Sequence, residues 1–499
     1  MSSNHYLSKS LFMKGLQCHK YLYLQKYHPE LQNQITEQQE AVFQHGADVG
    51  LLAQGLFPGG FTVHYEGLSH AEQIELTRSE MKRGAKTIYE AAFTYNGVFV
   101  KADMFHKGNK GWELYEVKSS TKEKEGHLDD IAIQHYVIKG AGIDICKAAL
   151  VHINTEYVRN GDIEVEKLFV IKDLTDRASE IQAVTAEKLF AMQAMLDGPM
   201  PDIDIGDYCD EPYECAFKSH CWRHIPKNSV FDLREKGIDK FAFYLAGKIR
   251  FEDIDPDELN FKQRMQVDAE LNNTVTLDIK GIRKFLKTLH YPIYFLDFEA
   301  FYDEPIPPFD GTRPYMKIPF QYSLHWIEKE GGKLHHKEYL AKTGKDGRED
   351  IARQLAESIP DNACVVAYKM SFEQEIIKGI ASSFPDYAER LLRINENMID
   401  LMAPFQKRLY YTKEMKGGYS IKVVLPALVP ELTYEGMAVS NGGDAVLAYK
   451  HLGQTSDPVE TKQIRKNLIE YCKLDTLAMV RILERIRECV LEKQYRQKI

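Results

Sequence analysis

An apolar run that ends in two closely spaced acids, IYFLDFEA, constrains this chain more than any other segment. Tyr294, Phe295 and Leu296 form the run, which predicts a buried β-strand. Side chains alternate between the two faces of a strand, so Asp297 and Glu299 should share one face. Two acids on one face of one strand can hold the same pair of divalent cations. The segment therefore predicts a metal site on one face of a buried strand.

Two later segments carry acids that could complete this site. A second apolar strand is predicted over 363–367, and Glu373 follows it in AYKMSFEQEII. In the helical stretch EYCKLDTLAMV, Tyr471 and Asp475 are four residues apart and so lie on one face. Several acids can hold two divalent cations, one serving an attacking water and the other the leaving oxygen of a phosphodiester. The ordered set predicts a site for Mg²⁺ or Mn²⁺.

The order of these motifs resembles that of the DEDD exonucleases of the ribonuclease-H-like fold, whose motifs run DxE, FD and YxxxD. The resemblance covers roughly residues 291–488 and implies a mixed sheet with flanking helices. It also implies that Tyr471 orients the attacking water. Glu373 stands where the family has aspartate, and Asp400 in MIDLMAPF is the rival for that position. The resemblance implies four metal ligands: Asp297, Glu299, Glu373 and Asp475.

A second candidate site lies in the first half of the chain. The segment VFVKADMFHKGNKGWELYEVKSS predicts a β-hairpin whose turn is GNKG. With the turn centred there, Asp103 lies opposite Glu116, and Lys118 shares the face of Glu116. The two acids could hold a divalent cation while Lys118 positions or activates water and offsets phosphate charge. The alternative is an ordinary solvated hairpin face with a cross-strand ion pair.

This hairpin, followed by IAIQHYVIKGAG, resembles the RecB-like branch of the PD-(D/E)XK nucleases. That branch has a glutamine with a nearby tyrosine on the next helix, here Gln134 and Tyr136. Gln134 is placed at the start of that helix, with a plain surface residue as the alternative. The branch also has a metal-ligating histidine upstream. This chain has Gly50 at that position, and His45 is nearby but out of register.

Cysteines form a third pattern. Cys209, Cys215 and Cys221 follow the spacing C-x5-C-x5-C, and Cys18 is a distant fourth. Thiolates ligate soft metals, and four of them suit an iron–sulfur cluster or a structural zinc, with unligated thiols as the third possibility. The arrangement resembles the iron–sulfur staple of RecB-like nucleases, which implies a [4Fe-4S] cluster that ties the start of the domain to its end. The remaining cysteines are predicted to be free buried thiols: Cys146, Cys364, Cys472 and Cys489.

Bulk properties limit the class of protein. With 499 residues, 44% of them hydrophobic, the chain can bury more than one core. The N-terminus lacks a signal-peptide core and no run of about 18 apolar residues exists, so we expect a cytoplasmic protein without membrane contact. The net charge of −9 means that nucleic-acid affinity must come from local basic patches and bound cations. One such patch interleaves cations and rings in KRLYYTKEMKGGYSIKVV, including Arg408 and Lys422.

Three regions are expected along the chain. Residues 1–225 should form an α/β, restriction-endonuclease-like domain of the PD-(D/E)XK type that closes at the cysteine cluster. Residues 226–288 read as a helical linker, with a helix-hairpin element that contacts DNA as the alternative. Residues 289–499 should form the ribonuclease-H-like domain.

Nearly the whole chain resembles a family of bacterial proteins that join a four-cysteine RecB-like nuclease domain to a ribonuclease-H-like exonuclease domain of uncharacterised function. The resemblance implies a metal-dependent nuclease acting on DNA, on single strands or ends, in repair or in defence against foreign DNA. One alternative is a non-catalytic nucleic-acid-binding scaffold that kept the folds and lost the chemistry. Another is an enzyme that cuts RNA, because a two-metal site contacts phosphates and does not reveal sugar selectivity.

Overall fold

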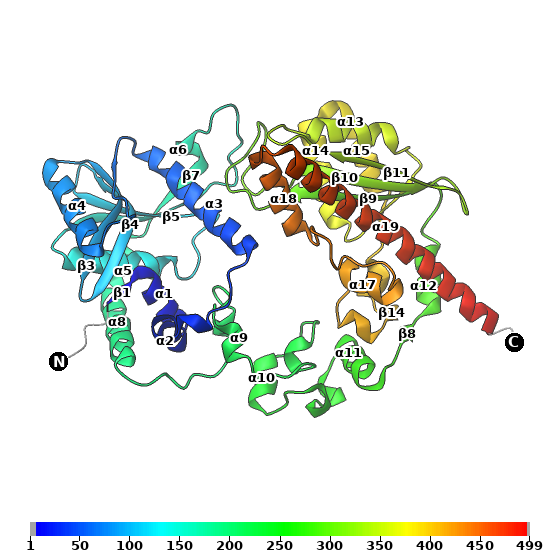
Figure 1. The fold of residues 1–499 in the computed structure, drawn as a ribbon, viewed down its shortest axis with the longest axis horizontal. Coiled ribbons are helices and arrows are strands. Elements are labelled where there is room, and N and C mark those ends of the chain that lie inside the picture. The colour runs from blue at the N-terminus through cyan, green and yellow to red at the C-terminus, as the bar shows by residue number, and fades with distance from the viewer. Residues whose placement is uncertain (1–5, 497–499) are drawn as a thin grey trace. The chain divides into compact units, whose positions relative to one another are not determined.

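The computed structural model describes residues 6–496, with side chains through Leu491. The chain divides into two units, each of which combines sheet and helices, so the α/β class is confirmed at that level (Figure 1). The first unit runs to His224 and also includes Glu304–Tyr315, which lies within the range 289–499 expected for the C-terminal domain. The second unit contains the remainder, so residues 226–288 belong to it. In the described part of the chain, no helix is long and apolar enough to cross a membrane.

The first unit is built on a seven-stranded sheet in the order β2-β3-β4-β5-β6-β7, with β1 paired in parallel with β4. Hairpin β4–β5 is antiparallel, and β5 and β6 are parallel. The strands are β1 (Leu7–Ser8), β2 (Phe61–Thr62), β3 (Thr87–Tyr95), β4 (Val98–Lys107), β5 (Trp112–Lys118), β6 (Ile145–Ile153) and β7 (Phe169–Asp173).

Helices cover both faces of this sheet. One face packs against α1, α5 and α8, where Phe12, Ile133 and Leu189 meet Leu114 of β5. The other face packs against α3 through Val49, beside Tyr115 of β5. The helices of this unit are α1 (Lys9–Gln17), α2 (His19–Tyr27), α3 (Glu37–Ala53), α4 (His70–Arg83), α5 (His127–Gly140), α6 (Val165–Leu168), α7 (Thr175–Glu180), α8 (Gln182–Leu196) and α9 (Lys218–Cys221).

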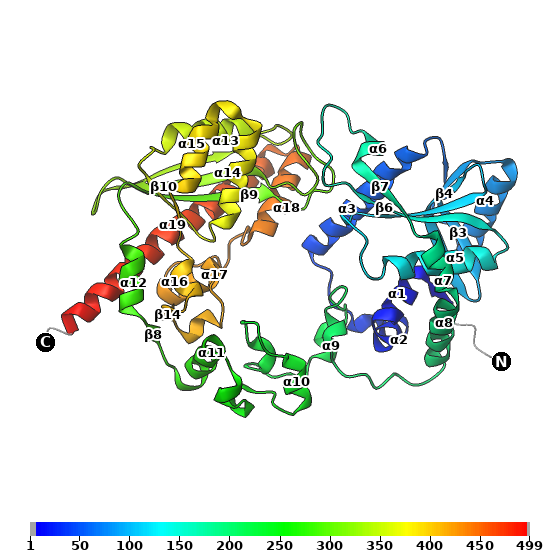
Figure 2. The same ribbon diagram turned by 180° about the vertical axis from the view of Figure 1, so that it is seen from behind.

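The second unit is built on a five-stranded mixed sheet in the order β11-β10-β9-β12-β13. The β9–β10–β11 part is antiparallel, whereas β9, β12 and β13 run parallel. Both views show α13, α14 and α15 on one face of this sheet and the long α19 on the other (Figure 1, Figure 2). The strands are β9 (Ile293–Phe301), β10 (Ile318–Ile327), β11 (Leu334–Leu340), β12 (Cys364–Ala367) and β13 (Met398–Asp400), and a separate pair joins β8 (Thr276–Leu277) to β14 (Tyr410–Tyr411).

The stretch expected to be a linker contains α10 and α11, but they do not form a tight helical hairpin. Gly247 turns the chain with a φ of 77°, and two 3₁₀ turns then separate the helices. The helices of the second unit are α10 (Lys240–Leu245), α11 (Phe261–Asn272), α12 (Ile279–Leu286), α13 (Arg348–Ser358), α14 (Ser371–Ser383), α15 (Pro385–Glu396), α16 (Ala403–Gln406), α17 (Ile421–Leu428), α18 (Gly442–Gln454) and α19 (Pro458–Arg496).

Candidate functional site

Strand β9 divides its residues between two environments, as the alternation predicted. Leu296 and Phe298 face the apolar core beneath α13–α15. Asp297 and Glu299 therefore face the opposite side of the sheet, where α19 packs. Strand β9 lies in the middle of the sheet, and β10 pairs with the backbone of both acids, whereas the pairing with β12 ends at Phe295, just before Asp297.

Helix α19 brings the late motif to these acids. Cys472 Sγ lies 3.8 Å from Asp297 Oδ2, and the candidate ligand atoms of Asp297, Glu299 and Cys472 lie within 4.8 Å of one another. Asp475 is one turn further along α19, and its charge raises the pKa of both strand acids. The structure thus brings three of the four expected carboxylates together. It also adds Cys472, which the sequence assigned to the free buried thiols.

Two residues that the sequence analysis did not place at this site surround Asp475. Tyr434 donates a hydrogen bond of 2.6 Å from its hydroxyl to Asp475 Oδ1. The ammonium of Lys422 lies over the rings of Tyr434 and Tyr471, 5.6 and 5.5 Å from their centroids. Lys422 also donates to the carbonyl of Ser440, which fixes its ammonium beside the acids. Tyr434 lies far from every motif in sequence, so only the folded chain reveals it.

Glu373 stands in the first turn of α14, just after β12, and is 2% exposed. Its Oε2 has no hydrogen-bond partner among the described residues. Its charge contributes to the raised pKa of Asp297 and of Glu299, so it belongs to the same electrostatic group. A buried carboxylate oxygen without a donor is costly, and a cation would satisfy it.

Asp400, the alternative to Glu373 as the fourth metal ligand, accepts hydrogen bonds from the backbone. Its Oδ1 accepts hydrogen bonds from the backbone N–H groups of Lys369 and Met402, at 3.0 and 2.9 Å. These bonds hold the chain at the ends of β12 and β13. Asp400 therefore supports the backbone through Oδ1, and the unpaired Oε2 of Glu373 makes that residue our hypothesis for the fourth ligand.

This assignment predicts opposite behaviour for two conservative variants. Glu373→Gln should weaken Mn²⁺ binding, because an amide supplies no negative charge, while leaving the melting temperature of the metal-free protein unchanged or higher. Asp400→Asn should keep Mn²⁺ binding and cost roughly 1 kcal/mol of stability through weaker backbone hydrogen bonds. Calorimetric Mn²⁺ titration and thermal unfolding of both variants check this. Loss of Mn²⁺ binding in Asp400→Asn alone would reverse the assignment.

All four carboxyl groups have raised pKa values. Burial raises the pKa of Glu373 to about 8 and that of Asp475 to about 6. Burial and mutual repulsion hold the pKa values of Asp297 and Glu299 well above their usual range. Among the described residues, no lysine, arginine or histidine nitrogen forms an ion pair within 4.0 Å with any of the four. Carboxylate oxygens without a paired cation are the ligands that Mg²⁺ and Mn²⁺ prefer, so the residues present fit the divalent cations.

The first-unit candidates also meet. Met104 of β4 pairs with Tyr115 of β5, the register that the hairpin turn predicted, and Asp103 Oδ2 accepts from the backbone N–H of Val117 at 2.7 Å. Glu116 and Lys118 lie on the face of β5 that packs against α1 and α5. Lys118 Nζ is 2.6 Å from Glu116 Oε1.

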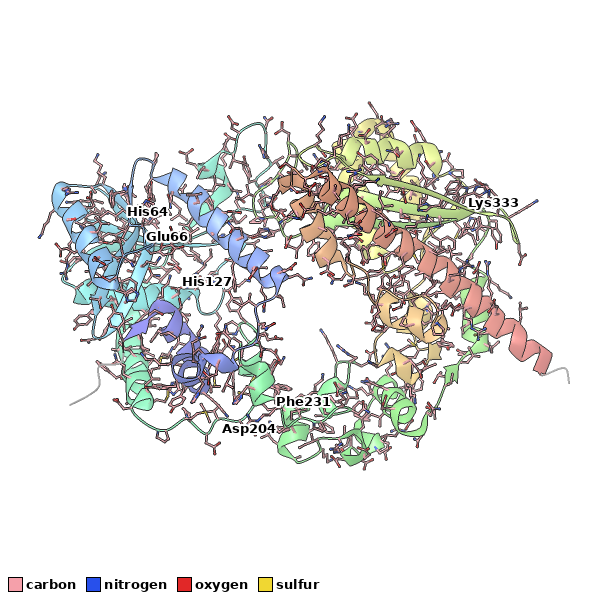
Figure 3. All side chains as sticks on the ribbon, viewed as in Figure 1. His64, Glu66, His127, Asp204, Phe231 and Lys333 are labelled. Atoms are coloured by element: carbon pink, nitrogen blue, oxygen red, sulfur yellow. The ribbon has the colours of Figure 1, made fainter. Side chains whose placement is uncertain are left out.

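Gln134 lies in the middle of α5, not at its start, and is fully buried. Its Nε2 donates to Glu116 Oε2 at 2.7 Å, so the surface alternative does not hold. Figure 3 labels His127, the first residue of this helix. Tyr136 faces away and accepts a hydrogen bond from Asn96. His45 pairs with Glu304, at 3.7 Å, in place of the hairpin acids.

Two residues that the sequence analysis missed complete this group. Asp130, one turn before Gln134 on α5, accepts from Lys118 Nζ through Oδ2 at 2.6 Å. Lys9, at the start of α1, places its ammonium 2.7 Å from Glu116 Oε1 and 3.2 Å from Asp130 Oδ1. Burial raises the pKa of Glu116 and of Asp103. Although burial alone would raise it too, the two ammonium groups hold the pKa of Asp130 well below its usual range.

The four cysteines of the third pattern line one small cavity of the first unit, together with Asp204, which is labelled in Figure 3. Cys18 separates α1 from α2, and Cys221 ends α9, so the cavity joins the start of the unit to its end. Burial raises the pKa of Cys215 to about 12. Among the described residues, no three of these sulfur atoms lie mutually within 4.8 Å.

That spacing bears on the choice of metal. Four thiolates around one zinc ion, with Zn–S bonds of about 2.3 Å, would lie roughly 4 Å apart. In a cluster each thiolate binds a different iron, so the sulfur atoms stay further apart. The four thiols that line the cavity are ligands that suit either group.

The basic segment around Arg408 is not an open strand-binding surface at that residue. Arg408 is 2% exposed and donates to the carbonyls of Gly417 and Gly418. It also pairs with Glu235 at 3.2 Å. Its charge therefore holds the Gly417–Gly418 turn, and Lys422 is the member of this segment that reaches the acids.

Comparison with known proteins gives one match. Residues 294–420 match a family described as a domain of unknown function, DUF2779. This range begins within β9 and includes Asp297, Glu299 and Glu373, but ends before Lys422 and Asp475. No curated protein and no solved structure matches the chain.

Proposed function

We propose that this protein is a metal-dependent nuclease that cuts DNA, with its catalytic centre at Asp297, Glu299, Glu373 and Asp475. One observation carries the proposal: candidate ligand atoms of Asp297 and Glu299 on β9 lie with that of Cys472 on α19 within 4.8 Å of one another, and the buried carboxylates of Asp475 and Glu373 are close enough to act on both acids. No ammonium or guanidinium pairs with any of these carboxylates within 4.0 Å among the described residues. Burying such a group is unfavourable unless cations enter. The arrangement is compatible with the DEDD-type, ribonuclease-H-like domain that the motif order resembles.

Each residue has a distinct task in this proposal. The four carboxylates would hold Mg²⁺ or Mn²⁺, which would generate the nucleophile from water and stabilise the leaving oxygen. Tyr434 holds Asp475 in one orientation through its hydroxyl. Tyr471, one turn from Asp475 on α19, would orient the attacking water, as the resemblance implies. Lys422 carries positive charge to the edge of the site, where the phosphate of a strand would lie.

The thiol cavity of the first unit would hold a [4Fe-4S] cluster through Cys18, Cys209, Cys215 and Cys221, with zinc as the alternative. Gln17, next to Cys18, already donates to the carbonyls of Tyr208 and Tyr213 on the far side of the cavity. A cluster would reinforce this closure between the two ends of the unit. Its proposed role is structural, in support of a PD-(D/E)XK-like fold.

Degradation of labelled single strands tests the function. With Mg²⁺ or Mn²⁺ the purified protein should shorten single-stranded DNA from its ends, and a chelator should stop the reaction. A matched RNA strand separates DNA from RNA specificity, since both share the phosphate chemistry. Binding of strands without degradation, whatever divalent cation is supplied, would replace the enzyme with the non-catalytic scaffold.

A further inference from the structure

The acids of the first-unit hairpin already have a cation among them. Lys9 Nζ lies 2.7 Å from Glu116 Oε1 and 3.2 Å from Asp130 Oδ1. Lys118 Nζ contacts the same two carboxylates from the other side, at 2.6 Å each. Three acids, with Asp103, therefore surround two ammonium groups.

The position of Lys9 is fixed by the fold. Leu7 and Ser8 form β1, which pairs in parallel with Val98 and Phe99 at the start of β4. The hydroxyl of Ser8 then accepts from the N–H of Leu11 and caps α1. Leu7 is fully buried, so the chain that precedes and follows Lys9 is anchored. This strand-to-helix turn holds Lys9 beside the acids. Its backbone position is fixed, unlike that of a lysine on a free surface.

Few carboxylate oxygens of the network are left for a metal. Glu116 Oε1 accepts from both ammonium groups, and its Oε2 accepts from Gln134. Asp130 accepts from Lys9 and Gln134 through Oδ1 and from Lys118 through Oδ2. Asp103 Oδ2 accepts from the N–H of Val117. Mg²⁺ and Mn²⁺ need several free oxygen ligands in an octahedral arrangement. Of the six carboxylate oxygens here, Asp103 Oδ1 alone lacks a donor among the described residues, and the buried amide Oε1 of Gln134 is the other unpaired oxygen of the network.

The second unit provides the contrast within the same chain. Its four acids have no ammonium within 4.0 Å among the described residues, and Glu373 Oε2 has no donor. Two lysines contact Glu116 and Asp130 of the first-unit network directly, whereas no ammonium pairs with the second-unit acids within 4.0 Å among the described residues. The residues of the first-unit site therefore do not fit a divalent cation.

We infer that Lys9 takes the place of a divalent cation between Glu116 and Asp130, so that the first-unit site binds no metal and metal-dependent cleavage belongs to the second unit alone. The ammonium supplies the positive charge that holds the hairpin against α5. Lys9 is thus a structural substitute for a metal at a site that otherwise keeps the residues of a nuclease.

Mn²⁺ binding in a protein without its second-unit site tests this inference. The background variant Asp297→Asn/Glu299→Gln retains the first-unit residues, and Mn²⁺ prefers carboxylates over the distant thiols. By electron paramagnetic resonance this background should show no specifically bound Mn²⁺. A bound ion that is lost on adding Glu116→Gln would overturn the inference, because a metal would then displace Lys9 in the native site.

Removing the lysine should create the metal site. In the same background, Lys9→Met should gain one bound Mn²⁺ per chain, and adding Glu116→Gln should abolish it. Lys188→Met is the matched control: it breaks the Lys188–Asp129 pair, at 3.0 Å, beside the network and should gain no metal. A folded Lys9→Met protein that gains none contradicts the inference. If Lys9→Met does not fold, the background variant still decides by itself.

Discussion

Asp297→Asn combined with Glu299→Gln is expected to abolish Mg²⁺-dependent cleavage and at the same time to raise the melting temperature of the metal-free protein. Changing a residue that only supports a metal ligand already costs about 10–100-fold, so losing two ligands should cost more than about 100-fold. The stability gain follows from removing two buried charges that repel Asp475 and Glu373. A gain of about 1 kcal/mol would raise the melting temperature by roughly 2–4 °C for a unit of this size.

The pH dependence of the metal-free protein has a definite sign. The folded pKa values of Asp475 and Glu373 lie above their ordinary values of 3.8 and 4.5, at about 6 and about 8. The folded state therefore holds protons that the unfolded state has released, and stability falls as pH rises. The loss should run from about pH 4, near the ordinary pKa values, to about pH 8. The double variant should show a flatter profile, and Mg²⁺ should restore the native protein most at high pH.

Thermal unfolding from pH 4 to 8, with and without Mg²⁺, measures both effects beside the cleavage assay. Glu375→Gln is a suitable control, because Glu375 lies on the same helix as Glu373 but is exposed and pairs with Lys317. It should leave cleavage and the pH profile unchanged. If the double variant is less stable than the native protein when both are free of metal, other groups must compensate the charge of the acids. If the double variant still cleaves DNA, the catalytic centre lies elsewhere.

Local periodicity predicted those parts of the site that lie within one element. Alternation along β9 placed Asp297 and Glu299 on one face, and the four-residue spacing on α19 placed Tyr471 beside Asp475. The same helical spacing joins Asp130 to Gln134 on α5, so it is the signal in the sequence that points to Asp130. Tyr434 offered no such signal, because only the packing of a distant loop brings its hydroxyl to Asp475.

The domain boundaries could not be predicted fully for the same reason, because contacts between segments far apart in the sequence decide them. The proline-rich segment after β9 looks like a loop of the C-terminal domain, yet Glu304–Tyr315 belongs to the first unit. Arg159 donates to the carbonyls of Pro307 and Pro308 at 3.0 and 2.8 Å, and Gly161 donates to Asp310. These bonds use two backbone carbonyls, one half-buried guanidinium and one carboxylate, which leave no periodic pattern in the sequence. Lys9 likewise contacts Glu116 of the hairpin from far away in the sequence, and no periodic pattern predicts this contact.

Cys215→Ser is expected to remove the cluster and to destabilise the first unit. Cys215 is 7% exposed and packs with Tyr21 and Phe217, and its N–H donates to the carbonyl of Cys209. Because metal binding contributes directly to folding, losing a ligand should cost more than about 2 kcal/mol, or at least roughly 4 °C in melting temperature. Protein purified without oxygen should be brown in the native form, with iron and sulfide in equal amounts, and colourless in the variant.

Cys146→Ser separates loss of the cluster from loss of a cysteine in general. Cys146 is an exposed thiol of β6 in the same unit and does not line the cavity, so its replacement should keep the colour and the melting temperature. Zinc as the sole bound metal in the native protein would exclude the cluster, although Cys215→Ser would still destabilise the unit. The cysteines belong to the first unit and the acids to the second. Chelation of Mg²⁺ should therefore leave the brown colour of the protein intact. Loss of the cluster should lower the stability of the first unit without removing the Mn²⁺ that Glu373 helps to bind.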